Sequence, residues 1–325
     1  MRHLVRRGAE ALVLFWLVVS LTFVLVRAAP GDAAQFLIPP DASAADAARV
    51  RTELGLDAPL AVQYARWLGG VLRGNLGESF AIRQPVGRVL ADALPVSLWL
   101  GITSLTLTFL VGVALGMAQA RRHGSPLDRT LTAFTVAVYS APSYWLALGL
   151  VALFTYGATR AGLPAWARLP AFGLVDPASD TTTWRALGDL VRHSVLPVTV
   201  LAAIGAAGIA RYTRARLLDL TSEEWVRTAR AKGVALPSVL RRHVLANALP
   251  TLVVLLGLSL PGIVAGSVFV EGIFAWPGMG RAMLNAINAR DYPVVMGATV
   301  VYAAVVIGAN LLADLALPLL DARRR

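Results

Sequence analysis

Six long runs of this 325-residue chain contain no aspartate, glutamate, lysine or arginine. The runs are Ala11–Val26, Ala93–Ala120, Thr130–Thr159, His193–Ala210, Val244–Val270 and Tyr292–Ala313. A helix needs about 18–20 mainly apolar residues to cross a bilayer, and each run reaches or approaches that length. Inside lipid, a helix is the form in which one segment satisfies all of its own backbone hydrogen bonds. The runs therefore predict an all-α integral membrane protein with six transmembrane helices.

The composition excludes an ordinary soluble domain. The chain is 57% hydrophobic and 15% charged, against about 25% charged residues in typical soluble proteins, and its mean hydropathy is +0.64. The N-terminus is basic and then apolar, as in a signal peptide, but Arg27-Ala28-Ala29-Pro30 is a poor cleavage site. We expect an uncleaved signal-anchor helix. The chain contains no cysteine, so it forms neither a disulfide nor a thiolate metal site.

The net charge of +11 follows a topological pattern. If the N-terminus is inside, more than half of the basic residues fall in short inside segments, and the others are spread over longer external ones, chiefly residues 27–92. The inside groups are Arg2, Arg6 and Arg7; Arg121, Arg122 and Arg129; the basic residues of Arg211–Arg242; and Arg323–Arg325. This bias predicts that both termini are cytoplasmic. It also accounts for the charge without a nucleic-acid partner.

The predicted spans divide the chain into three regions. Residues 1–92 hold the first helix and an external segment, residues 93–320 hold a core of five transmembrane helices with a cytoplasmic loop at 211–247, and residues 321–325 form a cytoplasmic tail. In the external segment, Ala44–Leu54 and Pro59–Leu72 are amphipathic and predict short surface helices. Small-residue pairs that allow close helix packing in lipid occur at Gly112/Gly116 and Gly262/Gly266.

The cytoplasmic loop has its own helix signals. Thr221 is predicted to be an N-cap with Glu224 in the reciprocal position, and Gly233 a left-handed C-cap. This predicts a helix of about eleven residues, roughly 16 Å long, followed by a second helix from Ser238. A passive loop, stabilised only by its inside charge, is the alternative. The length, the caps and the small residues Ala229, Ala231 and Gly233 favour docking of a protein partner.

Several chemical motifs are absent from the sequence. There is no Gly-x-x-x-x-Gly-Lys-Ser/Thr phosphate loop, no His-Glu-x-x-His zinc pattern and no Gly-x-Ser-x-Gly elbow. Carboxylates in the spans are scarce, Asp314 being the main exception, whereas ion-coupled carriers place them at mid-membrane. A secondary carrier or channel, and a receptor or scaffold, are therefore less favoured alternatives. A transporter of this composition would draw its energy from another subunit.

The segment Arg-Thr-Ala-Arg-Ala-Lys-Gly at 227–233 resembles the Glu-Ala-Ala-x-x-x-Gly loop of ABC importer permeases, in the variant of the dipeptide/oligopeptide and nickel branch. Arg227 and Thr228 stand where the general loop has Glu and Ala, while Ala229 and Gly233 match. The resemblance extends over nearly the whole chain. It includes Leu-Gly-Leu-Asp-Ala-Pro-Leu at 54–60, Val-Gln-Tyr-Ala-Arg-Trp-Leu at 62–68, Arg-Gly-Asn-Leu-Gly-Glu-Ser-Phe at 73–80, Val-Glu-Gly-Ile-Phe-Ala-Trp-Pro-Gly-Met-Gly-Arg at 270–281 and Arg-Asp-Tyr-Pro-Val-Val at 290–295.

The resemblance implies a type I ABC importer-like permease in a bacterial inner membrane. The implied partners are a second homologous permease, two ATP-binding subunits, an external substrate-binding protein and membrane lipid. This chain would be non-catalytic and bind no cofactor, because ATP and magnesium would be held by the partner ATPases. Short peptides are the implied substrate, with nickel chelates or other small solutes as the alternative.

Two groups of site residues follow. The coupling helix of the family, which docks on the ATPase, would use Glu224, Arg227, Thr228, Ala229, Arg230, Lys232 and Gly233. A second segment follows the fifth run and is too polar and Gly/Pro-rich to face lipid. It is predicted to form an external turn and short helix at the pore mouth, with Glu271, Phe274, Trp276, Pro277, Gly278, Gly280 and Asp291. An ordinary external loop is the alternative for that segment.

Overall fold

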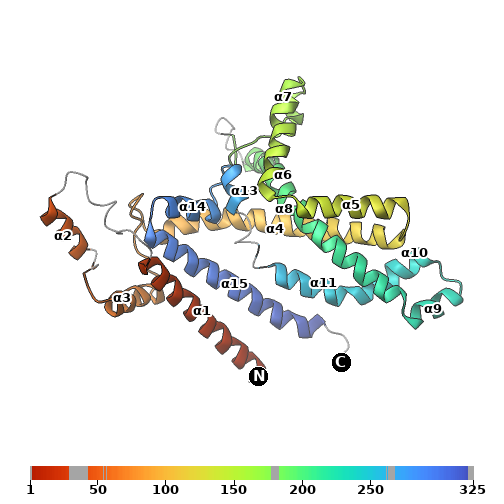
Figure 1. Cartoon of the computed structure of the whole chain (residues 1–325), viewed down its shortest axis with the longest axis horizontal. Coiled ribbons are helices and arrows are strands. Elements are labelled where there is room, and N and C mark those ends of the chain that lie inside the picture. Colours follow the sequence, from red (N-terminus) through yellow and green to blue (C-terminus); the bar gives the residue numbers. More distant parts are fainter. Residues whose placement is uncertain are drawn as a thin grey trace. The chain divides into compact units, whose positions relative to one another are not determined.

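The computed structural model describes residues 2–28, 43–53, 55, 57–176, 183–260, 262 and 268–320, and every named element in these ranges is a helix (Figure 1). The longer helices are α1 (Arg2–Ala28), α4 (Val86–Arg121), α5 (Pro126–Ser140), α8 (Thr183–Thr221), α11 (Leu245–Ser259) and α15 (Tyr292–Leu320). The shorter ones are α2 (Ala44–Glu53), α3 (Leu60–Leu72), α6 (Ser143–Val151), α7 (Ala158–Arg160), α9 (Glu224–Ala231), α10 (Leu236–Val239), α13 (Val268–Ile273) and α14 (Met279–Asn288). Single π-helical turns, η1 (Ala152–Gly157) and η3 (Leu240–Val244), connect α6 to α7 and α10 to α11, and η2 (Ala165–Ala167) is a 3-10 turn.

The predicted all-α membrane architecture is confirmed. Five described helices are long and apolar enough to cross a membrane, and a bent pair brings the number to six if the pair counts as one span. The five spans are Arg6–Ala28, Val86–Arg121, Trp184–Thr221, Leu236–Ser259 and Tyr292–Ala313. The most apolar stretch of α8 is 61% buried inside the protein, whereas that of α1 is only 11% buried. Most of α1 is therefore left to face lipid or another protein.

The run Thr130–Thr159, predicted as one span, is broken in the structure. The run forms α5 and then a second helical stretch, Ser143–Arg160, and the two are bent by 103°. Ala141 and Pro142 have extended backbones, with ψ of 133° and 136°. A proline disfavours helical backbone in the residue before it and lacks an amide hydrogen. Pro142 therefore breaks the run that its composition alone would join.

The fifth run, Val244–Val270, also differs from its prediction. The helical stretch begins earlier, at Leu236, and α11 ends at Ser259. Pro261 of this run and Gly266 of the predicted glycine pair lie outside the described residues, and α13 begins only at Val268. Pro250 is accommodated within α11.

The chain divides into two compact units, which are described separately. Unit 1 holds Met1–Ser97 and Pro277–Leu311, and unit 2 holds Leu98–Trp276 and Leu312–Arg325. In unit 1, the first turns of α4 pack against α14 and the start of α15. The buried side chains there are Val86, Leu90, Ala93, Met279, Ala286, Val294 and Ala298. A Cβ on Gly297 would lie 2.6 Å from Val86 Cγ1, so α15 approaches α4 as closely as a glycine permits.

In unit 2, α4 packs closely on α8 at two glycines. An ideal Cβ on Gly112 would lie 2.9 Å from the Ala206 carbonyl oxygen, and one on Gly116 would lie 2.6 Å from that of Ala210. Backbone atoms cannot rotate away, so only glycine fits at these two positions. The predicted close contact at Gly112 and Gly116 is confirmed. Gly262 of the second pair has no heavy atom within 4 Å of an ideal Cβ among the described residues.

The two predicted amphipathic helices after the first span are present as α2 and α3. In unit 1, α3 packs on α1 through Phe23, Tyr64 and Trp67, whose ring centroids lie 5.3–6.4 Å apart. Ser20 Oγ lies 2.6 Å from the Tyr64 hydroxyl oxygen. The predicted tail at 321–325 lies outside the described residues, and the predicted boundaries at 92 and 320 stay predictions.

Candidate functional site

The predicted docking helix is α9, although it begins later than its sequence signals indicated. It spans Glu224–Ala231, eight residues, and Glu223 is its N-cap without a side-chain hydrogen bond to the helix. Thr221 instead ends α8, and its hydroxyl donates to the Leu218 carbonyl at 2.7 Å. The capping box of Thr221 with Glu224 was therefore wrong. Thr221 still belongs to the last turn of α8, and its hydroxyl bonds back to that helix, a local arrangement that short polar side chains often adopt.

The C-terminal end of α9 matches its prediction. Gly233 has a φ of +84°, a left-handed conformation that glycine adopts at little cost. Its amide donates to the Arg230 carbonyl at 2.9 Å, and the Val234 amide donates to the Ala229 carbonyl at 3.2 Å. These two bonds form a Schellman motif. The motif ends the helix and satisfies two of its last carbonyls.

One side of α9 is held by apolar contacts in unit 2. Val226 is 1% exposed and belongs to a cluster between the end of α8 and the α10–η3 turn. Its buried members are Ala120, Leu217, Leu220, Val226, Val239, Leu240, Val244 and Ala248. Ala229, half-buried, packs on the same cluster. The helix is therefore held against α8, α10 and η3 mainly through one side chain, Val226.

The other side of α9 is exposed and charged. Of the seven predicted docking residues, six are exposed: Glu224, Arg227, Thr228, Arg230, Lys232 and Gly233. The structure brings these six together on one short element at the end of α8 (Figure 1). Of the three small residues predicted to favour docking, Ala231 and Gly233 are exposed, whereas Ala229 packs on the apolar cluster. A partner would thus meet a cationic surface interrupted by a patch without long side chains.

The second helix of the loop begins at Leu236, two residues before its predicted start at Ser238. Pro237 lies in its first turn, where the missing amide hydrogen costs nothing. The helix continues without a break through η3 into α11. The exposed side chains of Arg241, Arg242 and His243 lie in that π-helical turn. α9 is therefore connected to a membrane span on both sides, to α8 before it and to α11 after it.

An ion pair that the sequence analysis missed ties α5 to α8. The Asp128 carboxylate accepts two hydrogen bonds from the Arg214 guanidinium, each 2.9 Å long, and one from the Gly124 amide at 3.0 Å. The Asp128 side chain is 4% exposed. Such bidentate pairs fix both distance and orientation. Arg214 lies about one turn before Leu217, so the ion pair and the α9 cluster occupy neighbouring turns of α8.

The predicted pore-mouth residues are divided between the two units, because the boundary falls between Trp276 and Pro277. They are therefore described separately. In unit 2, Glu271, Phe274 and Trp276 are at most 1% exposed. In unit 1, Pro277 is exposed, and Gly278, Gly280 and Asp291 are buried. The predicted short helix after the turn is α14, which begins at Met279.

Asp291 has the most defined role in unit 1. Its carboxylate accepts hydrogen bonds from Ser79 Oγ at 2.5 Å and from the amides of Phe80 and Ala81 at 3.1 and 3.2 Å. Ser79 Oγ in turn accepts from the Ile82 amide at 3.1 Å. These bonds fix the turn that precedes α4. Sequence analysis selected Asp291 but not Ser79, since residues more than two hundred positions apart carry no local signal.

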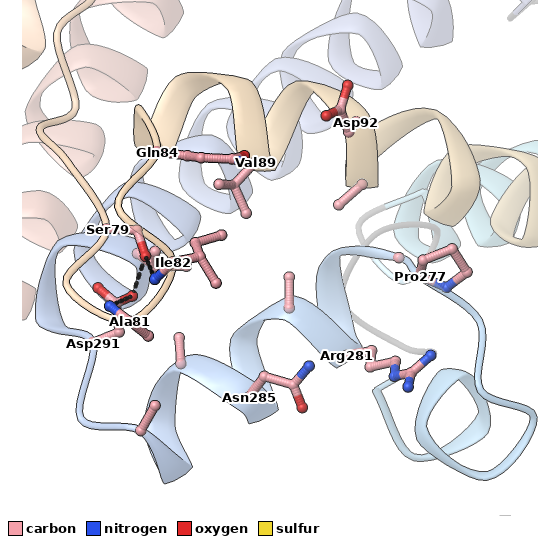
Figure 2. A pocket seen from close by; sticks show the side chains of 16 residues that line it. Ser79, Ala81, Ile82, Gln84, Val89, Asp92, Pro277, Arg281, Asn285 and Asp291 are labelled. Carbon is pink, nitrogen blue, oxygen red and sulfur yellow. Dashed lines mark hydrogen bonds between the residues drawn. The ribbon is translucent and has the colours of Figure 1, made fainter.

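The same turn borders a cavity of about 420 Å³ in unit 1. Figure 2 shows Arg281 and Asn285 of α14 across this cavity from Gln84 and from Asp92 of α4. Small apolar side chains, among them Ala93 and Ala286, line the rest of it. The arrangement is a polar-rimmed hollow with a positive and a negative side chain.

Two family matches together cover almost the whole chain. Residues 112–325 match the family of the binding-protein-dependent transport system inner membrane component, and residues 1–101 match its N-terminal membrane component. The chain belongs to this family of ABC importer permeases. It is a multi-pass protein of the inner membrane, and the permeases of this family work with ATP-binding and substrate-binding partners.

Curated relatives cover almost the whole chain. The oligopeptide transport system permease protein AppB of Bacillus subtilis is 33% identical over 322 residues, 99% of this chain and 98% of that protein. A protein of Brucella suis biovar 1, provisionally named a peptide permease, is 38% identical over 306 residues, 93% of this chain and 92% of the relative. A probable peptide ABC transporter permease of Sinorhizobium fredii is 34% identical over 323 residues, 99% of each chain.

The fold also has a solved counterpart. A chain of the MetNI methionine ABC transporter, in an inward-facing conformation, aligns with a TM-score of 0.55 at 19% identity. The alignment covers 72% of this chain and 96% of that one. The predicted ABC importer permease fold is therefore confirmed.

Proposed function

We propose that this chain is one permease subunit of an ATP-driven importer of short peptides, and that α9 is its docking element for an ATP-binding subunit. Support for the peptide substrate comes from the relatives, which are named as peptide and oligopeptide permeases. Support for the docking role comes from a single arrangement. α9 is capped by a Schellman motif, seated through Val226 and exposed on its charged side.

The proposed complex contains a second homologous permease, two ATP-binding subunits and an external substrate-binding protein. ATP and magnesium are bound by the ATPases, and this chain is non-catalytic and holds no cofactor. Both termini are cytoplasmic, which the grouping of arginines in short segments favours. In this orientation α9 faces the cytoplasm, and the segment around α14 lies on the external side.

In the proposed cycle, ATP closes the ATPase pair and displaces α9. The displacement reaches α8 through Val226 and its neighbours Leu217 and Leu220. Because Asp128 and Arg214 tie α5 to α8, α5 moves with α8. α11 receives the same input directly, since its helical stretch begins just after α9. Two spans, α8 and the helical stretch that contains α11, are thus reoriented together with α5, as alternating access requires.

Purification of the chain with its co-expressed partners tests the proposal. We expect the copurified binding protein to contain short peptides, and proteoliposomes of the complex to accumulate labelled peptide only when ATP is supplied to the ATPases. A nickel chelate or another small solute in the binding protein would refute the peptide assignment. Uptake by this chain without ATP-binding subunits would refute the importer assignment in favour of a secondary carrier.

A further inference from the structure

A second cavity, of about 310 Å³, lies wholly within unit 2, near the middle of α4. Side chains and glycines of α4, α5, α8 and α11 line it. Its lining residues that carry a hydroxyl are Ser104, Thr108, Tyr139, Tyr212 and Ser259. The volume is at the lower end of the range of about 300–1,000 Å³ for ligand pockets. The cavity opens onto the surface of the unit, since Tyr139 and Tyr212 are 51% and 62% exposed.

The aliphatic hydroxyls present acceptors to this cavity. Ser104 Oγ donates its hydrogen to the Leu100 carbonyl at 2.5 Å, and Ser259 Oγ donates to the Leu255 carbonyl at 2.7 Å. A hydroxyl has one hydrogen and two lone pairs. With the hydrogen committed to the backbone, the lone pairs are what each serine offers a ligand.

The two tyrosines add groups that can donate. The Arg211 guanidinium carbon lies 5.3 Å from the centre of the Tyr139 ring, a cation–π contact that holds the ring in place. An ideal Cβ on Gly208 would lie 3.4 Å from that ring, so the glycine leaves the ring its space. Phenolic hydroxyls both donate and accept. The cavity therefore offers acceptors for an N–H group and donors for a C=O group.

The described residues that line the cavity include no aspartate, glutamate, lysine, arginine or histidine. Arg211, which lies over the Tyr139 ring, is not among the lining residues. A charged group inside the cavity therefore meets no lining side chain of opposite charge. The amide group, by contrast, matches the available donors and acceptors. It is also common to all peptides, so a site that binds it accepts different sequences.

We propose that this cavity binds the main-chain amides of a short peptide during its passage through the membrane. The inference rests on the proposed function and adds a site on this chain to it. Recognition of the amide rather than the side chains lets the permease leave selection among peptides to the binding protein. Removal of one uncharged hydrogen bond weakens an interaction roughly two- to tenfold.

The test compares trialanine with an analogue in which an ester oxygen replaces one amide N–H. Proteoliposomes of the whole complex are supplied with binding protein saturated with either compound, and the initial uptake rate is measured. In the wild-type complex, we expect the peptide to enter roughly two- to tenfold faster than the ester. Ser104→Ala should reduce this preference, because it removes an acceptor for the N–H that the ester lacks. Tyr139→Phe removes a donor to the C=O that both compounds carry, so it should slow the uptake of both.

Matched controls come from the same helices or the same residue types. Thr106→Ala removes a hydroxyl of α4 that donates to the Ile102 carbonyl at 2.8 Å but does not line the cavity. Tyr144→Phe removes an exposed phenol that does not line it either. Both controls should keep the wild-type preference. If Ser104→Ala fails to assemble, Ser259→Ala, which removes the second acceptor, replaces it.

The outcomes separate the two proposals. Equal uptake of peptide and ester by the wild type, or an unchanged preference in Ser104→Ala, overturns the amide-binding site and leaves the proposed function standing. A wild-type complex that takes up no peptide overturns the proposed function and the site with it.

Discussion

The seating of α9 through Val226 gives a prediction whose magnitude can be worked out. Val226→Ala removes the equivalent of two CH₂ groups from a side chain that is 1% exposed. At about 0.8 kcal/mol per buried CH₂, the loss is about 1.6 kcal/mol. The higher helix propensity of alanine offsets about 0.6 kcal/mol of this loss. The net loss is about 1 kcal/mol, and any residual cavity increases it.

An eight-residue helix is not stable on its own, so this loss acts directly on the opening of α9. A net loss of about 1 kcal/mol corresponds to a roughly fivefold more frequent opening. Hydrogen exchange of the Lys232 and Gly233 amides, which bond to carbonyls of α9, measures it in the purified complex. We also expect peptide uptake per ATP hydrolysed to fall in this variant.

Val234→Ala is the matched control, since that valine is 39% exposed and lies after the helix. It should leave the exchange of the α9 amides close to the wild-type rate. Equal protection of α9 in Val226→Ala and the wild type would show that other contacts hold the helix. Equal acceleration in both variants would show that Val226 has no special role.

Three further substitutions follow from the geometry. Gly233→Ala should destabilise the C-terminal turn of α9 by about 1 kcal/mol, because φ is +84° there, although an added Cβ meets no atom within 4 Å. Faster hydrogen exchange of the Val234 amide would report this loss, and an unchanged exchange rate would contradict the prediction. Gly116→Val should destabilise the fold by about 1–3 kcal/mol through overpacking and so lower the thermal midpoint of the complex. Gly188→Ala, in open space on α8, should not lower the midpoint, and equal midpoints for the two variants would refute close α4–α8 packing. Asp128→Asn should cost about 1–3 kcal/mol, and combining it with Arg214→Gln should cost less than the sum of the two, as a double-mutant cycle of unfolding measures; strict additivity would mean that the pair does not couple α5 to α8.

The sequence predicted the architecture well where composition alone decides it. Runs without charged residues placed the spans, because lipid leaves helices as the form available to them. The exceptions are local. At Ala141 and Pro142 the apolar run continues while the backbone turns, and hydropathy does not record backbone geometry.

The candidate site was predictable in its exposed part and not in its buried part. Gly233 and the charged residues of α9 carry local signals, and the structure places them together. Thr221 shows the limit of such signals, since its hydroxyl had two possible backbone partners within a few residues. The Asp128–Arg214 pair joins residues 86 positions apart, and only the folded chain brings them together.

Cross-linking from α9 tests the central claim most directly. The chain has no cysteine, so Thr228→Cys creates a unique attachment point for a photoreactive maleimide on the exposed side of the helix. Ala161→Cys, exposed after α7 and beyond the bent pair, is the control that the proposed topology puts on the opposite side of the membrane. The account predicts a covalent adduct between the ATP-binding subunit and the Thr228→Cys variant alone. No adduct from Thr228→Cys, or an equal adduct from Ala161→Cys, would contradict it.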